Sequence, residues 1–369
     1  MYSSLYISGY RGLDSFRMRG LGRVNLLVGG NNSGKTSILE CIELLQSAGH
    51  PQVLASIAGR RGEWGYPSDG DARAAVGPRP EPIDVSHLFA NRQLRSRIRI
   101  EADRIGDAAS GGWNDKVTVY VEEPSGSDDE GRNADLVGED APFVLHVKWT
   151  NAEDDFRARI SEDGVLYRRQ RLTRLRGSAR QAIQFVRTGG LGAADVARTY
   201  SRFVFTDRDA PVKQALRVVE PTVEDIAPVA DDRRFLGRDG PGGVVVKLRE
   251  TDGQVPIGSM GDGLWRMLGL ALSIASAGGG VLLVDEIDTG LHYSTMEGMW
   301  RMIGAQAAAL SVQVFATTHS RDCYESLAAV AKSEAGAFTI QRIDRSRGEA
   351  VRFGSEAIVA AAEREIEVR

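Results

Sequence analysis

A short glycine-rich stretch near the start of the chain carries the residue types that bind phosphate. Residues 29–36 read Gly-Gly-Asn-Asn-Ser-Gly-Lys-Thr and satisfy the pattern G-x-x-x-x-G-K-[ST]. Glycines allow backbone N–H groups to surround an anion, the Lys35 ammonium can reach the terminal phosphates of a nucleotide, and the Thr36 hydroxyl can bind Mg²⁺. The residues expected to hold a nucleotide are Gly29, Asn31, Asn32, Ser33, Gly34, Lys35, Thr36 and Ser37.

The segments on either side of this stretch are those that a phosphate-binding loop requires. Residues 24–28 form an apolar run typical of a buried strand, and residues 36–47 place apolar side chains at helical spacing. A glycine-rich turn with a chance lysine is the alternative interpretation. It would need neither the strand before it nor the helix after it, so the context favours nucleotide binding.

Two carboxylates follow a second apolar run. Residues 281–284 read Val-Leu-Leu-Val and predict a buried strand, which Asp285 and Glu286 follow directly. Because side chains alternate along a strand, we expect the two carboxylates to point to opposite sides. Asp285 is expected to hold Mg²⁺ together with Thr36, and Glu286 to accept a proton from the attacking water. A strand followed by a solvated acidic turn is the alternative, and the phosphate loop argues against it.

A histidine follows the next predicted strand. Residues 313–316 form another short apolar run, which continues as Thr317-Thr318-His319-Ser320. Ligands of α/β sheets collect at the carboxyl ends of the strands, so His319 could contact the terminal phosphate and the attacking water. A purely structural histidine is the alternative. The expected catalytic residues are therefore Lys35, Glu286 and His319.

Taken in order, these signals resemble the ABC-type ATPase heads of the SMC-like group, particularly the AAA-type ATPases related to the overcoming-lysogenisation-defect family. The matching segments are Gly9-Tyr10-Arg11-Gly12-Leu13, GGNNSGKTS, Ser259-Met260-Gly261-Asp262-Gly263, VLLVDEIDTGLH and ATTHS. They cover residues 1–50 and 244–325. The resemblance implies an ATP- and Mg²⁺-dependent ATPase that forms a homodimer, or a higher assembly of dimers, closing head to head on two nucleotides.

The resemblance also implies roles for residues that no local pattern identifies. Ser259 and Gly261 would form a signature loop that binds the terminal phosphate of ATP held by the opposite subunit. Asp288 would cross the same dimer interface, and Arg11 would lie beside the nucleotide. The Q-loop glutamine that the resemblance implies has three candidates, Gln52, Gln93 and Gln184, which the sequence does not separate.

The expected fold class is α/β, a P-loop NTPase of the ABC-ATPase head type with an inserted lobe of strands and helices and no long coiled coil. Residues 1–50 and 244–369 would form the ATPase core, and residues 51–243 the inserted lobe. Strands are expected at 96–102, 116–122, 143–149 and 156–160, helical segments at 167–187, 212–227, 261–277, 294–309 and 355–367, edge strands at 340–344 and 350–353, and an irregular linker at 51–85.

Composition sets limits on the partners and the compartment. The 369 residues contain 46 Lys plus Arg and 50 Asp plus Glu, a formal charge of −4, so that any contact with nucleic acid must be local. Two cysteines and no export signal indicate a reducing cytoplasm, and no apolar stretch is long enough for a membrane helix.

Several functions stay open at this point. The resemblance favours an ATPase that regulates a separately encoded effector, in an antiphage defence module. A DNA repair or recombination ATPase would bind DNA through the basic segment Arg168–Arg187, although a solvated helix explains that segment equally well. A nucleotide-gated scaffold with very slow hydrolysis is the third candidate, and a transporter ATPase or a small-molecule kinase is disfavoured. Only 49 residues follow Ser320, so no nuclease domain is expected.

Overall fold

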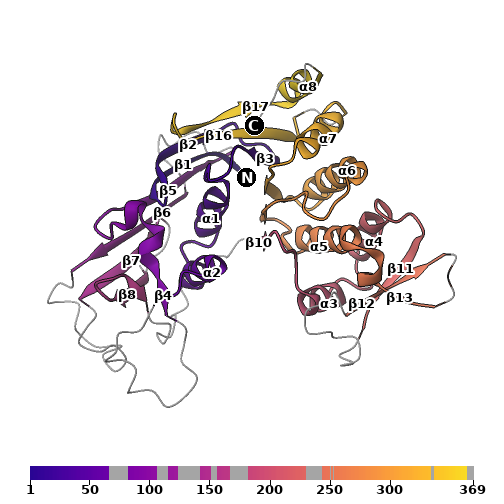
Figure 1. Ribbon diagram of the computed structural model, residues 1–369, viewed down its shortest axis with the longest axis horizontal. Coiled ribbons are helices and arrows are strands. Elements are labelled where there is room, and N and C mark those ends of the chain that lie inside the picture. The colour runs from indigo at the N-terminus through magenta and orange to yellow at the C-terminus, as the bar shows by residue number, and fades with distance from the viewer. Residues whose placement is uncertain are drawn as a thin grey trace, which may run out of the picture.

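A long mixed sheet organises the protein, as the computed structural model shows (Figure 1). The structure describes residues 1–65, 82–105, 115–123, 142–150, 156–166, 182–229, 243–249, 251, 253–333 and 336–363. The sheet has the strand order β10-β14-β15-β3-β16-β17-β2-β1-β5-β6-β7-β8-β9-β4. Its strands are β1 (Tyr2–Tyr10), β2 (Leu13–Arg19), β3 (Val24–Val28), β4 (Ile83–Asp84), β5 (Ile98–Arg104), β6 (Asp115–Glu122), β7 (Phe143–Trp149), β8 (Phe156–Ile160), β9 (Val165–Leu166), β10 (Ile183–Val186), β14 (Val281–Val284), β15 (Gln313–Thr317), β16 (Phe338–Asp344) and β17 (Glu349–Phe353).

One half of this sheet is parallel. Strands β10, β14, β15, β3 and β16 pair in parallel, with Leu283 opposite Phe315 and Ala316 opposite Leu26. Every residue of β3, β14 and β15 is buried, as expected for strands covered on both faces. Their carboxyl ends therefore share one edge, where the phosphate loop, Asp285 and Thr317 all emerge. Strand β17 joins the two halves, antiparallel to β16 and parallel to β2. From β2 to β4 in the sheet order, neighbouring strands pair antiparallel.

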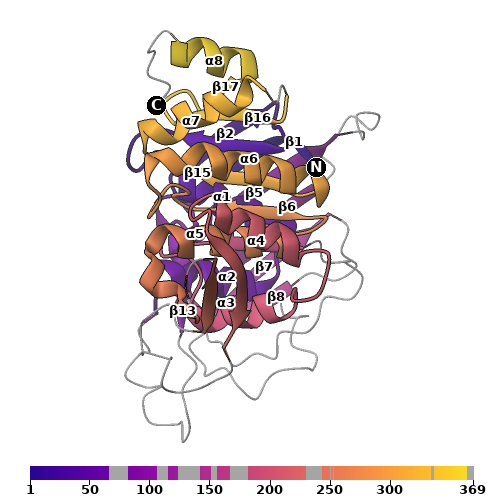
Figure 2. The ribbon, with the colours of Figure 1, turned by 90° about the vertical axis from the view of Figure 1, so that its right-hand side faces the viewer.

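Helices cover both faces of the parallel half. The helices are α1 (Lys35–Gln46), α2 (Pro51–Arg61), α3 (Ala193–Ser201), α4 (Asp209–Arg217), α5 (Asp262–Ser276), α6 (Tyr293–Ala309), α7 (Arg321–Ala331) and α8 (Ser355–Glu363), with short 3₁₀ segments at η2 (Val85–Leu88), η3 (Ala90–Arg92) and η5 (Ile257–Met260). Leu26 packs into the core with α5 and α6, whereas its neighbour Leu27 packs into the core with α1. Figures 1 and 2 show α1 and α2 on one side and α5, α6 and α7 on the other.

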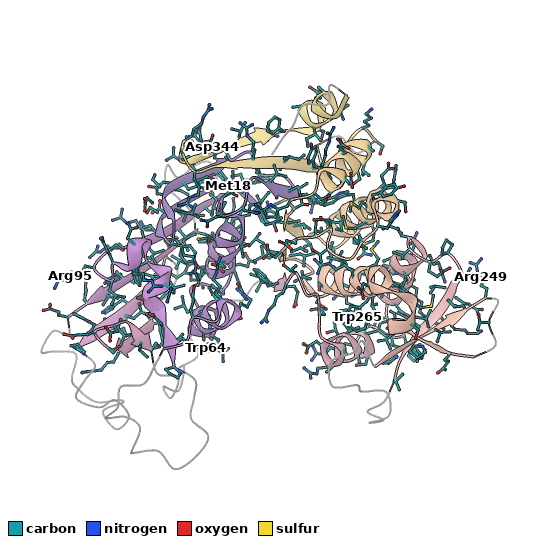
Figure 3. All side chains as sticks on the ribbon, in the orientation of Figure 1. Met18, Trp64, Arg95, Arg249, Trp265 and Asp344 are labelled. Atoms are coloured by element: carbon teal, nitrogen blue, oxygen red, sulfur yellow. The ribbon has the colours of Figure 1, made fainter. Side chains whose placement is uncertain are left out.

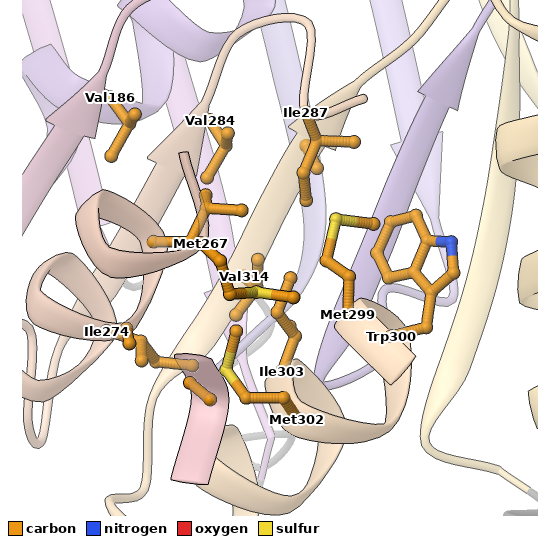
Figure 4. Packing of buried hydrophobic residues seen from close by; sticks show 14 of the residues in the cluster. Val186, Met267, Ile274, Val284, Ile287, Met299, Trp300, Met302, Ile303 and Val314 are labelled. Carbon is orange, nitrogen blue, oxygen red and sulfur yellow. The ribbon is translucent and has the colours of Figure 1, made fainter. Parts of the chain in front are cut away.

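The first of these cores lies between the parallel strands and α5 and α6. Figure 4 shows Val186, Val284 and Val314 of three strands facing Met267 of α5 and Ile303 of α6. Trp300 is fully buried there, meets the Phe338 ring edge-on and donates its indole N–H to the Cys323 carbonyl oxygen. Satisfying that N–H removes the cost of burying it and fixes α6 against α7.

Helix α1 lies between the two halves of the sheet and is buried on almost every side. Its carboxylates Glu40 and Glu43 therefore need partners, because an unpaired buried charge is strongly destabilising. Glu40 accepts hydrogen bonds from Tyr10, Arg11 and Arg61, and Arg60 forms an ion pair with Glu43. These bonds fix the helix that begins at the phosphate loop.

A second, small sheet extends the α5 side of the molecule. It contains β11 (Val223–Pro228), β12 (Val244–Leu248) and β13 (Val255–Pro256), all antiparallel. Helices α3 and α4 pack between this sheet and α5, and the Tyr200 hydroxyl of α3 donates to Asp209 of α4. Figure 3 shows Arg249 beyond this sheet and Trp265 on α5, while Trp64 and Arg95 lie on the side with β5–β8.

The α/β class and many predicted elements are confirmed. Strands β5, β6, β7 and β8 lie where the sequence predicted strands, and β3, α1, β14, α6 and β15 also match their predictions. The predicted linker is wrong at its start, because residues 51–61 form α2. The helical prediction is wrong for 183–186, which form β10, and for 223–227, which lie in β11. Strands β16 and β17 are interior strands, since each has neighbours on both sides.

Some predictions concern residues that the structure does not describe. Most of the basic segment Arg168–Arg187 lies in the undescribed range 167–181. The end of the predicted C-terminal helix, beyond residue 363, also lies outside the described residues. Among the helices that are described, α6 is the longest at 17 residues, and none combines the length and the apolar character needed to cross a membrane.

Candidate functional site

The phosphate loop connects β3 to α1 and is shaped by glycines. Gly34 adopts φ 98° and forms the N-cap of α1, without any side-chain cap. A side chain at Gly29, which has φ 149°, would place a Cβ 3.0 Å from Ser33 Oγ. A Cβ at Gly30, by contrast, would meet nothing within 4 Å. The loop is therefore tightly curved inside and open outside, with the positive end of the α1 dipole directed at it.

Lys35 lies inside this curve. Its Nζ donates to the carbonyl oxygens of Gly29 at 2.8 Å and Gly30 at 2.9 Å, and the residue is 5% exposed. Burial lowers the pKa of Lys35, while the carboxylates of Asp285 and Glu286 act in the opposite direction. The ammonium thus lies at the centre of the loop, where a phosphate would meet it.

The acidic strand end meets the start of α1. Thr36 Oγ1 lies 3.2 Å from both carboxylate oxygens of Asp285, although the two residues are 249 positions apart in the sequence. Thr317 Oγ1, at the end of β15, donates to Asp285 Oδ1 at 2.7 Å. Hydroxyl and carboxylate oxygens are the donors that Mg²⁺ prefers, and Mg²⁺ commonly takes only one or two protein ligands beside phosphates and water. The residues present therefore fit a magnesium ion.

Glu286 has an unusual backbone. Strand β14 ends at Val284, and Glu286 has φ 47°, a left-handed conformation that costs a residue with a side chain about 1–2 kcal/mol. Its N–H donates to Thr317 Oγ1 at 2.8 Å, and its carbonyl oxygen accepts from Arg266 at 2.7 Å. The direction of this side chain is therefore set by the left-handed backbone, and the strand alternation invoked from the sequence does not apply.

The residues predicted to form a signature loop, Ser259 and Gly261, lie where η5 meets the start of α5. Ser259 is exposed on η5, and Gly261, with φ 87°, is the N-cap of α5. A Cβ at Gly263 would come 3.4 Å from the Gly290 carbonyl oxygen, so the start of α5 packs directly on the turn that follows Asp288. Asp288 Oδ1 accepts a hydrogen bond from Thr318 Oγ1 at 2.6 Å.

The other predicted residues are distributed as follows. His319 is exposed directly after the Thr317-Thr318 pair, and Asn31 and Asn32 are exposed on the phosphate loop. Arg11, with φ 51°, bonds Glu40 of α1 and both carboxylate oxygens of Glu63, so its guanidinium is engaged in the α1 ion-pair cluster. Of the three glutamine candidates, Gln184 lies on β10 beside Leu282 of β14, Gln52 on α2 and Gln93 after η3.

Three residues of the site were missed from the sequence. Thr317 holds Asp285, Arg266 holds the carbonyl of Glu286, and Arg345 Nη1, in the turn between β16 and β17, donates to the Asn32 carbonyl oxygen at 3.1 Å. Thr317 belongs to the polar cluster 317–320 that was expected at this strand end, but its bond to Asp285 was not predicted. Neither arginine belongs to a local pattern, since both reach the site through tertiary structure.

A phosphate loop between a parallel strand and a helix, with an acidic residue at the end of a nearby parallel strand, defines the nucleotide-binding fold of P-loop ATPases. Comparison with known families agrees. The chain belongs to the family described as "AAA domain, putative AbiEii toxin, Type IV TA system", whose model matches residues 24–322. The predicted relationship to AAA-type ATPases is thereby confirmed.

The individual proteins and structures that match share only a short segment or a low sequence identity with this chain. The uncharacterized protein MJECL10 of Methanocaldococcus jannaschii is 38% identical over 48 residues, which span 13% of this chain and 22% of that protein. Among solved structures, an SMC head bound to the C-winged helix domain of ScpA is 14% identical with a TM-score of 0.46, covering 96% of this chain and 98% of that one. The SMC head domain of Thermotoga maritima is 12% identical with a TM-score of 0.40, at the same coverages of 96% and 98%.

Proposed function

We propose that this protein binds ATP with Mg²⁺ and hydrolyses it. The observation that carries the proposal is the meeting of Thr36, Asp285 and Thr317 beside the buried Lys35 ammonium, which joins the phosphate loop to two strand ends. These residues are far apart in the sequence, and structural stability alone does not require a lysine inside a glycine loop. Their chemistry is that of a phosphate and metal site.

Each residue then has a defined task. Lys35 and the N–H groups of the loop bind the terminal phosphates, and Thr36 and Asp285 would hold Mg²⁺, which neutralises phosphate charge when bound. Glu286 accepts the proton of the attacking water, because its carboxylate follows the metal residue at the same sheet edge. His319 contacts the terminal phosphate from the end of the neighbouring strand β15.

The direct test is release of phosphate from ATP by the purified chain, with Mg²⁺ and with excess EDTA. We expect turnover with Mg²⁺ and a loss of at least about tenfold with EDTA, since metal charge stabilises the transferred phosphoryl group. Restoring Mg²⁺ should restore the rate. Tight ATP binding without any phosphate release would support the nucleotide-gated scaffold, and absence of both would refute the assignment of the site.

We further propose that two chains close head to head, so that Ser259, Gly261 and Asp288 of one chain complete the nucleotide site of the other. The exposure of Ser259 supports this arrangement, because its hydroxyl is open to a second chain. In the same proposal, residues 1–50 and 244–369 form the ATPase core, 51–243 the inserted lobe, and the chain acts in the cytoplasm.

Mixed dimers test whether Ser259 acts on the partner's nucleotide. A Lys35→Ala chain and a Ser259→Arg chain should each be inactive alone, but a mixed dimer has one site with both residues intact. We expect the mixture, purified through two different tags, to recover up to about half of the wild-type rate, because one of two sites is complete. Mixed dimers that hydrolyse ATP no faster than either parent would contradict the composite site.

The biological task that we propose is regulation of a separately encoded effector, within an antiphage defence module. Membership of a family whose description names a toxin of a type IV toxin–antitoxin system supports this context. ATP-driven closure of the two chains would change the surface offered to the effector, and hydrolysis would reverse the change.

A further inference from the structure

Arg266 is a buried charge that the proposed chemistry has not yet used. It lies in the second turn of α5, is 5% exposed, and has the apolar neighbours Met267 and Leu268 fully buried beside it. Among the described residues it forms no ion pair within 4.0 Å, and its Nε has no hydrogen-bond partner. A buried guanidinium is costly, and an apolar side chain would fill this place at less cost. Its presence therefore calls for a specific reason.

Within the described part of the chain, the guanidinium donates only to backbone carbonyl oxygens, which belong to two separate segments. Nη1 donates to Arg187 at 2.9 Å and to Thr188 at 3.3 Å, just after β10. Nη2 donates to Asp285 at 3.1 Å and to Glu286 at 2.7 Å, just after β14. Burial lowers the pKa of Arg266, and the carboxylates of Asp288, Asp285 and Glu286 act in the opposite direction. One side chain of α5 thus ties together two strand ends and lies within the field of the site's carboxylates.

One of the Arg266 hydrogen bonds is made to a residue with a strained backbone, Glu286. Glu286 has a left-handed backbone, which a residue with a side chain keeps only when its surroundings enforce it. Thr317 holds its N–H from the β15 side, and Arg266 holds its carbonyl oxygen from the α5 side. Without the second bond, Glu286 would be released toward an ordinary conformation and its carboxylate would change direction.

We infer that Arg266 is a positioning residue that holds Glu286 in its left-handed conformation and couples this conformation to α5, whose N-terminus carries Gly261. The inference rests on the proposed hydrolysis by Glu286. Only the four residues 262–265 separate Gly261 of the signature loop from Arg266, so a shift of that loop reaches the hydrolytic carboxylate through one rigid helical turn. Arg266 thereby makes hydrolysis depend on the position of the signature loop.

The variants Arg266→Lys and Arg266→Met test this role. Lysine keeps the charge but cannot span both carbonyl pairs, and methionine keeps only the length. We expect kcat to fall about 10- to 100-fold in both, as is typical when a residue supporting a catalytic group is lost, with a smaller loss for lysine. KM and the affinity for a fluorescent ATP analogue should stay within about threefold of wild type, because the phosphate loop is untouched.

Arg208→Met is the matched control. Arg208 also donates to a carbonyl oxygen of α5, that of Ala275. Ala275 lies at the C-terminal end of the helix, whereas Arg266 lies near its N-terminal end. Its removal should leave kcat within about twofold of wild type, as for a residue with no partner in the site. Circular dichroism must show the folded state of each variant.

A double-mutant comparison separates positioning from general stability. In a Glu286→Gln background, adding Arg266→Lys should change the single-turnover rate by less than about threefold, because both act through the same carboxylate. The role would be overturned if the rate loss of the double variant equalled the product of the losses of Glu286→Gln and Arg266→Lys. It would also be overturned by a wild-type kcat in Arg266→Lys, or by unfolding of both Arg266 variants. A wild-type protein without ATP turnover would instead refute the proposed function, and the inference with it.

Discussion

Replacing Lys35 by alanine should abolish ATP binding and turnover while the fold stays intact. The ammonium lies inside the phosphate loop, and its charge-assisted bonds to phosphate are each stronger than a neutral hydrogen bond. We expect the affinity for ATP to fall by at least about 100-fold, or ~2.8 kcal/mol of binding free energy. The fold should persist, because the hydrogen bonds that the Lys35 ammonium makes to described residues all go to groups of the loop itself, and the Gly30 side of the loop is open to water.

Lys247→Ala is the control for this change. Lys247 forms an ion pair with Glu224 on the small sheet, and 58% of its side chain is exposed. Its replacement should therefore leave ATP binding unchanged. Isothermal titration with ATP and Mg²⁺ would measure both affinities, and circular dichroism would verify both folds. A folded Lys35→Ala protein with normal affinity would show that the loop does not bind nucleotide phosphate.

The elements nearest the phosphate loop were predictable because their signals are local. The apolar run of β3, the glycine pattern and the helical spacing of α1 lie within 25 consecutive residues, and each is readable by itself. The antiparallel strands β6 and β8 were also predictable, since buried residues largely alternate with more exposed ones along them.

The secondary-structure and strand-order predictions were wrong where contacts between distant parts of the chain determine the structure. Prolines and glycines at 51–85 predicted an irregular linker, yet Pro51 is the first residue of α2, a position where proline is well tolerated, and Gly62, at φ 68°, ends that helix. Strands β16 and β17 were expected at an edge, but β3 and β2 pair with their outer sides. No sequence signal of β16 shows that a strand more than 300 residues away will pair with it.

The residues of the site also fall into two groups, those with a local sequence signal and those without one. Lys35, Thr36, Asp285 and Glu286 were identifiable because each belongs to a short pattern or directly follows an apolar strand. The groups that orient them were not, since Arg266 reaches Glu286 from another element and Arg345 reaches the loop from the β16–β17 turn. Orientation is a property of tertiary contacts, and the left-handed backbone of Glu286 is visible only when those contacts are known.

Glu286→Gln should separate ATP binding from hydrolysis. Glutamine keeps the size and polarity of glutamate but cannot accept a proton, whereas Thr36, Asp285 and Thr317 bond one another without any part of the Glu286 side chain. We therefore expect ATP affinity near that of wild type and turnover slower by about 100-fold or more, the usual contribution of a positioned general base. Glu297→Gln, an exposed change on α6 where Glu297 pairs with Arg301, is the control and should hydrolyse normally.

The same variant should report on closure of the dimer. If hydrolysis reopens two chains that ATP has closed, then Glu286→Gln with ATP and Mg²⁺ should form a dimer, or a larger assembly of dimers, that outlasts the wild-type one. Light scattering over time would compare the two proteins. Wild-type turnover in the variant would remove the catalytic role of Glu286. Loss of ATP binding would instead make its carboxylate a metal ligand or a structural group, because a proton acceptor is needed only after the nucleotide is bound.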